Sequence, residues 1–337
     1  MDLLPDTQQD AVAEAASRVL ADLGHPDRAN EHAASGQASD GELWKLAVEL
    51  GWLGLAVPER DGGAGCGLPE QVMLVRELGR SLAVGPFVGT MVAVGMAEGV
   101  LRDELLAGRP VASAFGLDSD GRLLVAEAPG ADLVLRWWPD RAELLESPES
   151  GVPVAGIDPT LGLEVVDGDA ARVVAEGSTS VTATATVLRS AGLVGIAEAV
   201  RDQAVHHALV REQFGRPIGS FQAIKHLCAD MAVRAEAAWR QTCWAAVAVR
   251  DGRPDAARHV AAARLVAQAA ALEGAAANIQ VHGAMGFTAE HTAHLFLKRA
   301  RSWSLLQRLD GPATLDGTGP DSPACVGQRR TSVSRPL

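Results

Sequence analysis

One segment of the chain combines an arginine with amide side chains at the junction of two expected helices, a set suited to binding a nucleotide. The segment is REQFGRPIGSFQAIKH, residues 211–226. We expect Arg211 and Gln213 in the last turn of the first helix and Gln222 at the start of the second. Arginine offers a planar fork of donors that suits a pyrophosphate, glutamine can bond to both edges of a nucleotide, and a helix N-terminus favours an anion. By composition and spacing alone, an arginine at a helix end is more often a solvated cap.

A second segment, IQVHGAMGF at residues 279–287, places an amide and two glycines at the end of another long helix. Gln280 falls on the last helical turn, and Gly283 and Gly286 allow the backbone to turn closely against another group. Physical reasoning alone favours a simple helix stop at this point.

Tyrosine and cysteine offer little chemistry in this chain. The chain has no tyrosine, so no tyrosine acid or base can be proposed. Its four cysteines are widely separated and none forms a CxxC pair, which argues against a zinc site, and we expect no metal site. We expect all four to be free thiols in a reducing compartment: Cys66, Cys228, Cys243 and Cys325.

Three regions of different texture must position these segments, and together they predict an α+β fold. Residues 1–108 form an N-terminal helical domain, in which the helix over Leu43–Leu50 stops at Gly51 and further helices cover about 69–83 and 87–105. Residues 109–185 form a reduced middle β domain of short apolar segments separated by Gly, Pro and Asp. The segments expected to be strands are Val111–Leu117, Leu123–Ala128, Asp132–Trp138, Ala142–Leu145, Leu163–Val166, Ala171–Ala175 and Ser180–Ala185.

Residues 186–310 are expected to form a C-terminal four-helix bundle. Its first helix shows one apolar face that includes Leu193, Ile196 and Val200. The remaining helices are expected over about 221–250, 255–281 and 289–308. The tail, residues 311–337, is rich in Gly, Pro, Ser and Thr, and we expect it to be disordered.

Charge and hydropathy argue against several classes of binding partner and location for the chain. A net charge of −12 argues against a general nucleic-acid binder, which needs a basic surface to displace phosphate counterions. We find no run of about 18 apolar residues that would span a bilayer. The N-terminus, MDLLPDTQQD, lacks the basic start and apolar core of a signal peptide, and we expect a cytoplasmic protein.

The segments at 211–226 and 279–287, in this order, resemble the C-terminal domain of the acyl-CoA dehydrogenase family. LWKLAVELGWLGLAVPERDGGAG at 43–65 and ELGRSLAVGPF at 77–87 resemble its N-terminal domain. The resemblance implies an FAD enzyme that oxidises a CoA thioester to its α,β-unsaturated form, in which a glutamate takes the α-proton. It also implies dimers or tetramers in which the bundle of one subunit reaches the FAD of its neighbour. The cross-subunit FAD contacts then fall on Arg211, Gln213, Phe214, Gln222, Gln280, Gly283 and Ala284.

Two departures from the family pattern separate this chain from a self-sufficient enzyme. The middle domain is short and lacks the Gly-rich and Trp-x-Ser/Thr segments with which the family holds the flavin ring. The usual glutamate near the end of the bundle falls on Gln307, and the alternative position on an earlier helix falls near Ala185 and Thr186. We therefore assign no catalytic residue, although Asp310 remains open as a displaced base and Glu290 is expected to cap a helix start.

Both departures resemble the short subunit of α2β2 acyl-CoA dehydrogenases that act on CoA thioesters of steroid side chains. The resemblance implies a full-length acyl-CoA dehydrogenase homologue as partner, an FAD shared across the interface, an acyl-CoA substrate, and an electron-transfer flavoprotein or similar acceptor. Two alternatives stay open. One is a non-catalytic structural or binding homologue, and the other is an autonomous homodimeric enzyme with an unrecognised base.

Overall fold

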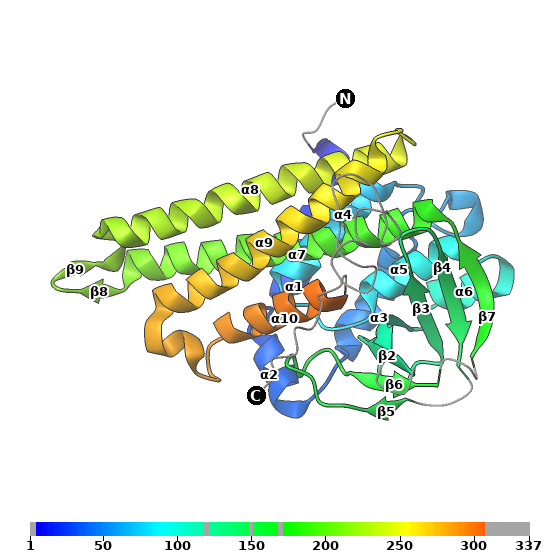
Figure 1. Cartoon of the computed structure of the whole chain (residues 1–337), viewed down its shortest axis with the longest axis horizontal. Helices are drawn as coiled ribbons and strands as arrows, with labels where there is room; N and C mark the ends of the chain where they lie inside the picture. Colours follow the sequence, from blue (N-terminus) through cyan, green and yellow to red (C-terminus); the bar gives the residue numbers. More distant parts are fainter. Residues whose placement is uncertain (1–4, 118–121, 148–150, 168–170, 307–337) are drawn as a thin grey trace, which may run out of the picture.

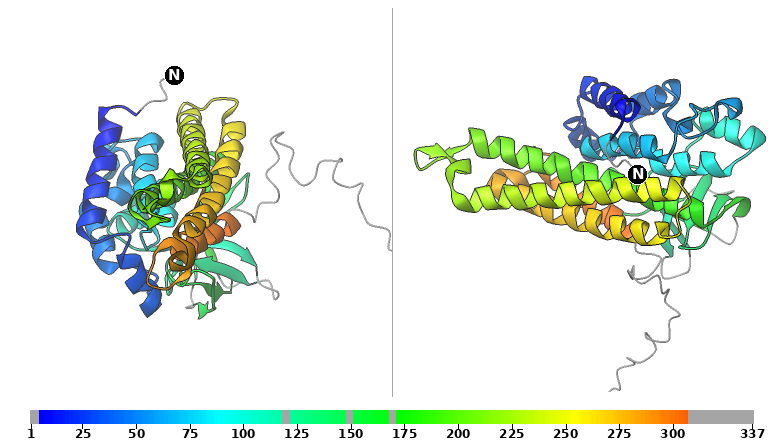
Figure 2. Two further views of the ribbon diagram at one scale, coloured as in Figure 1. Left: turned by 90° about the vertical axis from the view of Figure 1, so that its left-hand side faces the viewer. Right: turned by 90° about the horizontal axis from the view of Figure 1, so that it is seen from above.

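A computed structural model describes residues 5–117, 122–147, 151–167 and 171–306 of the chain. N-terminal helices, a β-sheet and a bundle of long helices pack against one another, and the far end of the bundle projects beyond the rest (Figures 1 and 2). The positions of Gln307, Asp310 and Cys325 and the predicted tail at 311–337 lie outside the described residues.

The N-terminal region is helical, as predicted, with one difference. Asp6 and Gln9 form a capping box at the start of α1, and Gly51 takes a φ of 72° just after α3. The helix predicted over 87–105 is two helices, because Ala97 is extended and Gly99 has a φ of 55°. The elements are α1 (Thr7–Asp22), α2 (Arg28–Ser35), α3 (Gly41–Glu49), η1 (Trp52–Gly54), η2 (Glu59–Asp61), α4 (Leu68–Arg80), α5 (Phe87–Met96) and α6 (Gly99–Leu106).

The middle region is a single sheet in the order β5-β6-β2-β1-β3-β4-β7. Strands β1 and β3 pair in parallel, with Val111 opposite Leu133, and the other pairings described are antiparallel. One face packs on the main core beside α5 and α7, and the other carries its own apolar cluster. The strands are β1 (Val111–Leu117), β2 (Leu123–Ala126), β3 (Leu133–Trp137), β4 (Ala142–Glu146), β5 (Val152–Pro153), β6 (Glu164–Val166) and β7 (Arg172–Gly177).

The strand predicted over Ser180–Ala185 is wrong, because these residues open the first helix of the bundle. Helix α7 (Thr179–Val210) begins where the Ser178 side chain accepts a hydrogen bond from the Ser180 backbone N–H. The Val and Thr residues that suggested a strand are accommodated in a helix whose packing partners decide its conformation. Helix α7 therefore starts before the predicted boundary at 185/186.

Helix α7 is the centre of the bundle. Every residue from 187 to 200 is buried, so the helix has no solvent face there, in contrast to the single apolar face that was predicted. It packs against α4 on one side and against α8 (Gln222–Arg250) and α9 (Ala256–His282) on the others. Helix α10 (Ala293–Leu306) completes the bundle.

Helices α7 and α9 test the expectation that no segment of the chain is long and apolar enough to span a bilayer. By length and composition alone, α7 and the stretch Ala256–Phe287 could each cross a membrane, contrary to the expectation that no segment would qualify. Most of the apolar stretch of α7 is buried inside the protein, and α9 packs against α7, α8 and α10. Burial therefore accounts for the apolar composition of α7, whereas only 39% of the apolar stretch within Ala256–Phe287 is buried.

A buried ionic network joins the sheet to the bundle. Arg189 of α7 is fully buried and pairs with Glu127, which follows β2 with a positive φ of 77°. Glu127 also accepts hydrogen bonds from Ser113 Oγ at 2.9 Å and from Trp303 Nε1 at 2.9 Å. Burial raises the pKa of Glu127, but the charge and hydrogen bonds of Arg189 outweigh burial and hold it below its ordinary value. The network therefore ties β1, α7 and α10 to one carboxylate.

Candidate functional site

The predicted cofactor-facing residues lie at the projecting end of the bundle, in two groups. The first surrounds a short hairpin of β8 (Glu212–Gln213) and β9 (Arg216–Pro217) that connects α7 to α8 (Figure 1). Gln222 begins α8, as predicted, whereas Arg211 is the C-cap residue that follows α7 rather than part of its last turn. Gln213 is in strand β8 rather than in the last turn of the helix, because α7 already ends at Val210.

The tip of this hairpin is held by aromatic contacts. Phe214 has a φ of 54°, is 92% exposed, and meets Phe221 edge-on at 6.0 Å. The guanidinium of Arg216 lies 4.3 Å from the centre of the Phe221 ring. Arg216, which sequence reasoning did not select, therefore brings a second cation to the same hairpin. Its position in the Gly-Arg-Pro break was the available signal.

The second group lies where α9 ends. Gln280 is exposed in the last turn of α9, and Gly283 and Ala284 open the turn η4 (Gly283–Phe287). Gly283 takes a φ of 63° and no atom lies within 4 Å of where a Cβ would stand. Its backbone can thus be approached closely by a ligand, as the sequence suggested.

Stacked histidine rings bring the two groups together. His207, in the last turn of α7, stacks on His282, the last residue of α9, with ring centroids 4.2 Å apart. His282 in turn lies 4.4 Å from His291. Sequence reasoning missed these contacts, since only the fold brings residues so far apart in the chain into contact.

The free polar groups at this end fit a dinucleotide. Arg211 is exposed and forms no ion pair with any residue that the structure describes. The side chains of Gln222 and Gln280 are exposed and make no hydrogen bond within the described part of the chain, whereas Gln213 Nε2 donates to the Glu212 carbonyl at 2.8 Å. A free guanidinium, two free amides and an open glycine turn are a donor set suited to pyrophosphate and nucleotide groups.

Large apolar side chains are exposed around these polar groups. Leu209, Val210 and Phe214 are between 62% and 92% exposed, and Phe287 of η4 is 75% exposed. Exposed apolar residues that gather at one end of a molecule, beside free polar groups, are typical of a surface that another molecule covers.

Ala185 and Thr186, at the alternative position for a catalytic base, carry no carboxylate. Ala185 is fully buried, and Thr186 Oγ1 donates to the Thr182 carbonyl at 2.9 Å. Glu290 is exposed and precedes α10 by two residues of turn, and a backbone hydrogen bond together with Thr288 lowers its pKa. It keeps the ordinary charged state of a surface carboxylate.

A hollow of about 250 Å³ lies beside the start of α7, between it, α4 and α5. Among the described residues that line it, none is an aspartate, glutamate or histidine. The lining is mainly apolar, and its polar members are Gln71, Ser180 and Thr184. This hollow can receive an apolar group, but its walls supply no group able to abstract a proton from carbon at neutral pH.

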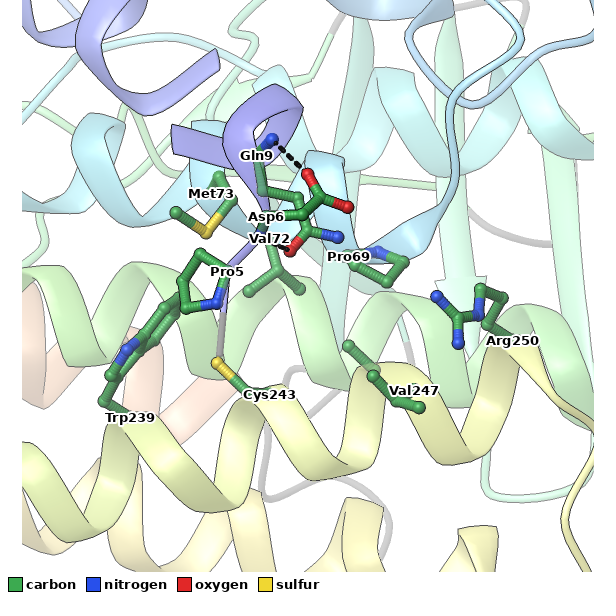
Figure 3. Close-up of a pocket in the computed structure, with 11 residues that line it drawn as sticks. Pro5, Asp6, Gln9, Pro69, Val72, Met73, Trp239, Cys243, Val247 and Arg250 are labelled. Carbon is green, nitrogen blue, oxygen red and sulfur yellow. Dashed lines mark hydrogen bonds between the residues drawn. The ribbon is translucent and has the colours of Figure 1, made fainter. Parts of the chain in front are cut away.

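A second hollow, of about 230 Å³, lies among α1, α4 and α8 (Figure 3). Met73 and Val72 form one wall, and Cys243 points into the hollow from α8 (Figure 3). Burial raises the pKa of the Cys243 thiol to about 12, so the thiol is protonated and unreactive at neutral pH. Cys66, Cys228 and Cys243 are free, in agreement with the sequence prediction.

Comparison with known proteins defines the class to which this fold and site belong. The family model described as "Acyl-CoA dehydrogenase, N-terminal domain" matches residues 6–102, and "Acyl-CoA dehydrogenase, C-terminal domain" matches residues 179–307. Acyl-CoA dehydrogenase IpdE2 of Mycobacterium tuberculosis is 33% identical to the chain over 321 residues, which cover 92% of the chain and 95% of that protein.

Solved structures share the fold over nearly the whole chain. The ChsE4-ChsE5 complex from Mycobacterium tuberculosis superposes with a TM-score of 0.78 at 24% identity, covering 93% of this chain and 96% of the matched one. A variant of the Tcur3481-Tcur3483 steroid ACAD superposes with a TM-score of 0.73 at 26% identity, covering 89% and 96%.

The chain therefore belongs to the acyl-CoA dehydrogenase family. It is an oxidoreductase of the class that acts on the CH–CH group of an acyl-CoA, and this family generally binds FAD. The predicted order of a helical region, a β region and a helical bundle is confirmed, and the structure shows that the sheet is mixed.

Proposed function

We propose that this chain is a partner-dependent subunit of an FAD-dependent acyl-CoA dehydrogenase. It completes the FAD site of a full-length homologue and supplies no catalytic base of its own. The observation that carries this proposal is the projecting end of the bundle, where free donors stand beside exposed apolar side chains. A second subunit packed on that end would cover the apolar surface and bring its FAD to the donors.

In this assembly Arg211 would hold the pyrophosphate, while Gln280 and the backbone at Gly283 and Ala284 would hold the nucleotide portion. Gln222, Gln213 and Phe214 would line the same cofactor from the hairpin side. Bound FAD supplies hydride acceptance from the β-carbon of the thioester. The contribution of this chain is to orient and retain the cofactor and to exclude water from it.

The proton-abstracting group belongs, in this proposal, to the partner. An amide such as Gln307 is no base for a carbon acid, and Ala185 at the alternative position has no ionisable group. The mainly apolar hollow beside α7 also lacks a carboxylate among the described residues that line it. These observations support a chain that retains the cofactor-facing half of a site and leaves the acid–base half to another chain.

The substrate and assembly are proposed from likeness. The Tcur3481-Tcur3483 protein is titled a steroid ACAD, and the ChsE4-ChsE5 structure is titled a complex. We propose a CoA thioester of a steroid side chain as substrate and an α2β2 assembly with a full-length homologue. The enzyme would work in the cytoplasm and would pass electrons to an electron-transfer flavoprotein or a similar acceptor.

Co-purification tests the proposal directly. The chain expressed alone is expected to carry little or no flavin, because half of the cofactor contacts are missing. Expressed with the full-length homologue, it should give a complex with about one FAD per heterodimer and dehydrogenase activity, a stoichiometry set by one shared site per pair. A full FAD complement and steady turnover from the chain alone would instead establish an autonomous homodimeric enzyme, and absence of flavin with every partner would establish a non-catalytic homologue.

The Arg211→Ala variant of the assembled enzyme is expected to bind FAD about 10- to 100-fold more weakly, since charged hydrogen bonds contribute about 1.5–3 kcal/mol each. The measurement is flavin release followed by fluorescence during dilution. Arg18→Ala is the matched control, because Arg18 is an exposed arginine on α1, away from the bundle end, and should leave FAD affinity unchanged. Unchanged affinity in Arg211→Ala would remove Arg211 from the cofactor site.

A further inference from the structure

The histidine stack joins the two turns that bear the cofactor-facing residues. His207 precedes Arg211 by one helical turn, and the Arg211 backbone N–H donates to the His207 carbonyl at 2.9 Å. His282 lies between Gln280 and Gly283 in the chain. The 4.2 Å stack of the two rings therefore fixes the separation of the two turns.

One hydrogen bond beside the stack requires Nδ1 of His291 to be unprotonated. His291 Nδ1 lies 3.0 Å from the backbone N–H of Ala293, the first residue of α10, and must accept this bond. A protonated imidazolium has no acceptor atom, so charging His291 breaks the bond. His282 Nδ1 lies 2.9 Å from the Asn278 carbonyl and donates to it.

We call the contact between the Arg211 turn and the Gln280–Gly283 turn the joint. A second set of hydrogen bonds across this joint contains no titratable group. Asn278 Nδ2 donates to Gln203 Oε1 at 2.9 Å, and Gln203 Nε2 donates to Thr292 Oγ1 at 3.3 Å. This chain of amides also connects α9, α7 and the turn before α10. The joint thus has one tie that acid can alter and one that it cannot.

We propose that His207, His282 and His291 are positioning residues that hold the Arg211 turn against the Gln280–Gly283 turn, and that protonation of this cluster opens the joint and releases the cofactor. Only the release of cofactor rests on the proposed function. The opening itself follows from ring stacking and from the bond at Ala293. Like charges at ring separations of 4.2 and 4.4 Å repel one another in a partly buried site.

The surroundings of His207 work in the same direction. Burial lowers its pKa, and the charges of His282, Arg211, His291 and His206 lower it further. These groups face it from its own helix, from α9 and from the turn before α10. No acidic group is among the charges that act on it most strongly.

The pKa of His291 is also lowered, although one nearby charge raises it. Burial and the charge of His282 lower its pKa, Asp27 near α2 raises it, and His294 lowers it. The pKa of His294 is itself lowered by burial and by Lys298, and raised by the Ala289 backbone and, less strongly, by Asp158. The lowered pKa values of His207, His291 and His294 favour the neutral form of these three rings.

The sign of the pH dependence follows from these directions. A histidine whose pKa is lower in the closed joint than in the open one binds more protons when the joint is open. The neutral rings therefore stabilise the closed joint above the ordinary histidine pKa of about 6.5. This stabilisation is lost as the pH falls from there through the lowered pKa values of the cluster. The joint should therefore open on mild acidification.

Hydrogen exchange on the full chain tests the opening. We expect amide protection factors in residues 205–216 and 280–291 to fall roughly ten- to hundredfold between about pH 7.5 and about pH 5, with smaller changes elsewhere. The His207→Phe/His282→Phe variant keeps two stacked rings that cannot be charged, so it should lose the part of this pH dependence that comes from repulsion between rings and keep only the smaller part that comes from the bond of His291 to Ala293. Gln203→Ala is the matched control, since it should lower protection at every pH and leave the pH dependence intact.

The outcomes separate this inference from the proposed function. A flat wild-type protection profile, or a pH dependence that the double phenylalanine variant retains in full, would overturn the inference. In the co-purified enzyme, flavin release should follow the same pH profile in the wild type and not in the variant. If the profile is seen by hydrogen exchange while no partner ever confers flavin, the joint is pH-sensitive and the proposed function fails by itself.

Discussion

Replacing Arg189 with methionine is expected to destabilise the protein by about 3–5 kcal/mol, the usual cost of breaking a buried ion pair by removing one partner. The variant would leave Glu127 buried, with Ser113 and Trp303 as its side-chain donors and the more distant charge of Arg299 in place of its ion-pair partner. Because the pKa of Glu127 is held low in the folded protein, the native pair contributes stability above the ordinary glutamate pKa and loses it as the pH falls further. Urea unfolding followed by tryptophan fluorescence measures the loss.

Two further variants decide whether the lost ion pair is the cause. Arg189→Met/Glu127→Leu removes both charges and should recover much of the stability, because the unpaired carboxylate is gone. Arg240→Met breaks the half-exposed i,i+4 pair with Glu236 and should cost less than about 1 kcal/mol. Equal losses in the single and double variants would show that packing of the arginine stem, rather than the unpaired charge, accounts for the effect.

The position of this network links stability to the proposed division of labour. Glu127 follows strand β2, Arg189 is in the first half of α7, and Trp303 is on α10, so their network fixes the sheet against the bundle. The cofactor-facing turns lie at the other end of α7 (Figures 1 and 2). The loss expected in Arg189→Met is therefore a loss of attachment of the sheet, which provides a second route to low activity that flavin binding at the bundle end would not detect.

Local signals in the sequence were sufficient for most element boundaries. The stop at Gly51 and the start of α8 at Gln222 both follow from residues next to the boundary. The residues Ser180–Ala185 were read as a strand because Val and Thr favour strands, while their packing against the N-terminal helices selects a helix. Such tertiary effects are invisible in a short window of sequence.

The candidate site also contains residues that local sequence signals indicate and contacts that only the fold creates. Arg211, Gln222 and Gln280 were proposed because each lies near a helix end marked by glycine or proline, in segments that resemble the acyl-CoA dehydrogenase family, and their contact with FAD stays a prediction. The stack of His207 on His282 was missed because no local pattern states that the ends of α7 and α9 meet. The same holds for the pairing of Glu127 with Arg189, since charged residues are ordinarily expected at the surface.

Helices α4 and α7 cross so closely that Gly195→Ala is expected to lower the free energy of unfolding by roughly 3 kcal/mol or more. A Cβ at Gly195 would stand 1.9 Å from the Arg76 carbonyl oxygen, and one at Gly79 would stand 2.0 Å from the Gly192 carbonyl oxygen. Backbone atoms at such distances cannot yield as the end of a flexible side chain can, so the helices must move apart. Separation would weaken the bidentate bond of Arg76 to Glu198, at 2.7 and 3.0 Å across the same crossing.

Gly95→Ala is the matched control, because Gly95 is also helical but has no atom within 4 Å of where a Cβ would stand. It should leave stability unchanged or raise it by up to about 1 kcal/mol, the difference in helix propensity between glycine and alanine. Thermal and urea unfolding of the two variants beside the wild type provide the measurement. A Gly195→Ala protein as stable as the Gly95→Ala protein would mean that α4 and α7 cross less closely in solution. The position of the bundle end relative to the N-terminal helices, and with it the surface offered to a partner, would then differ from that described.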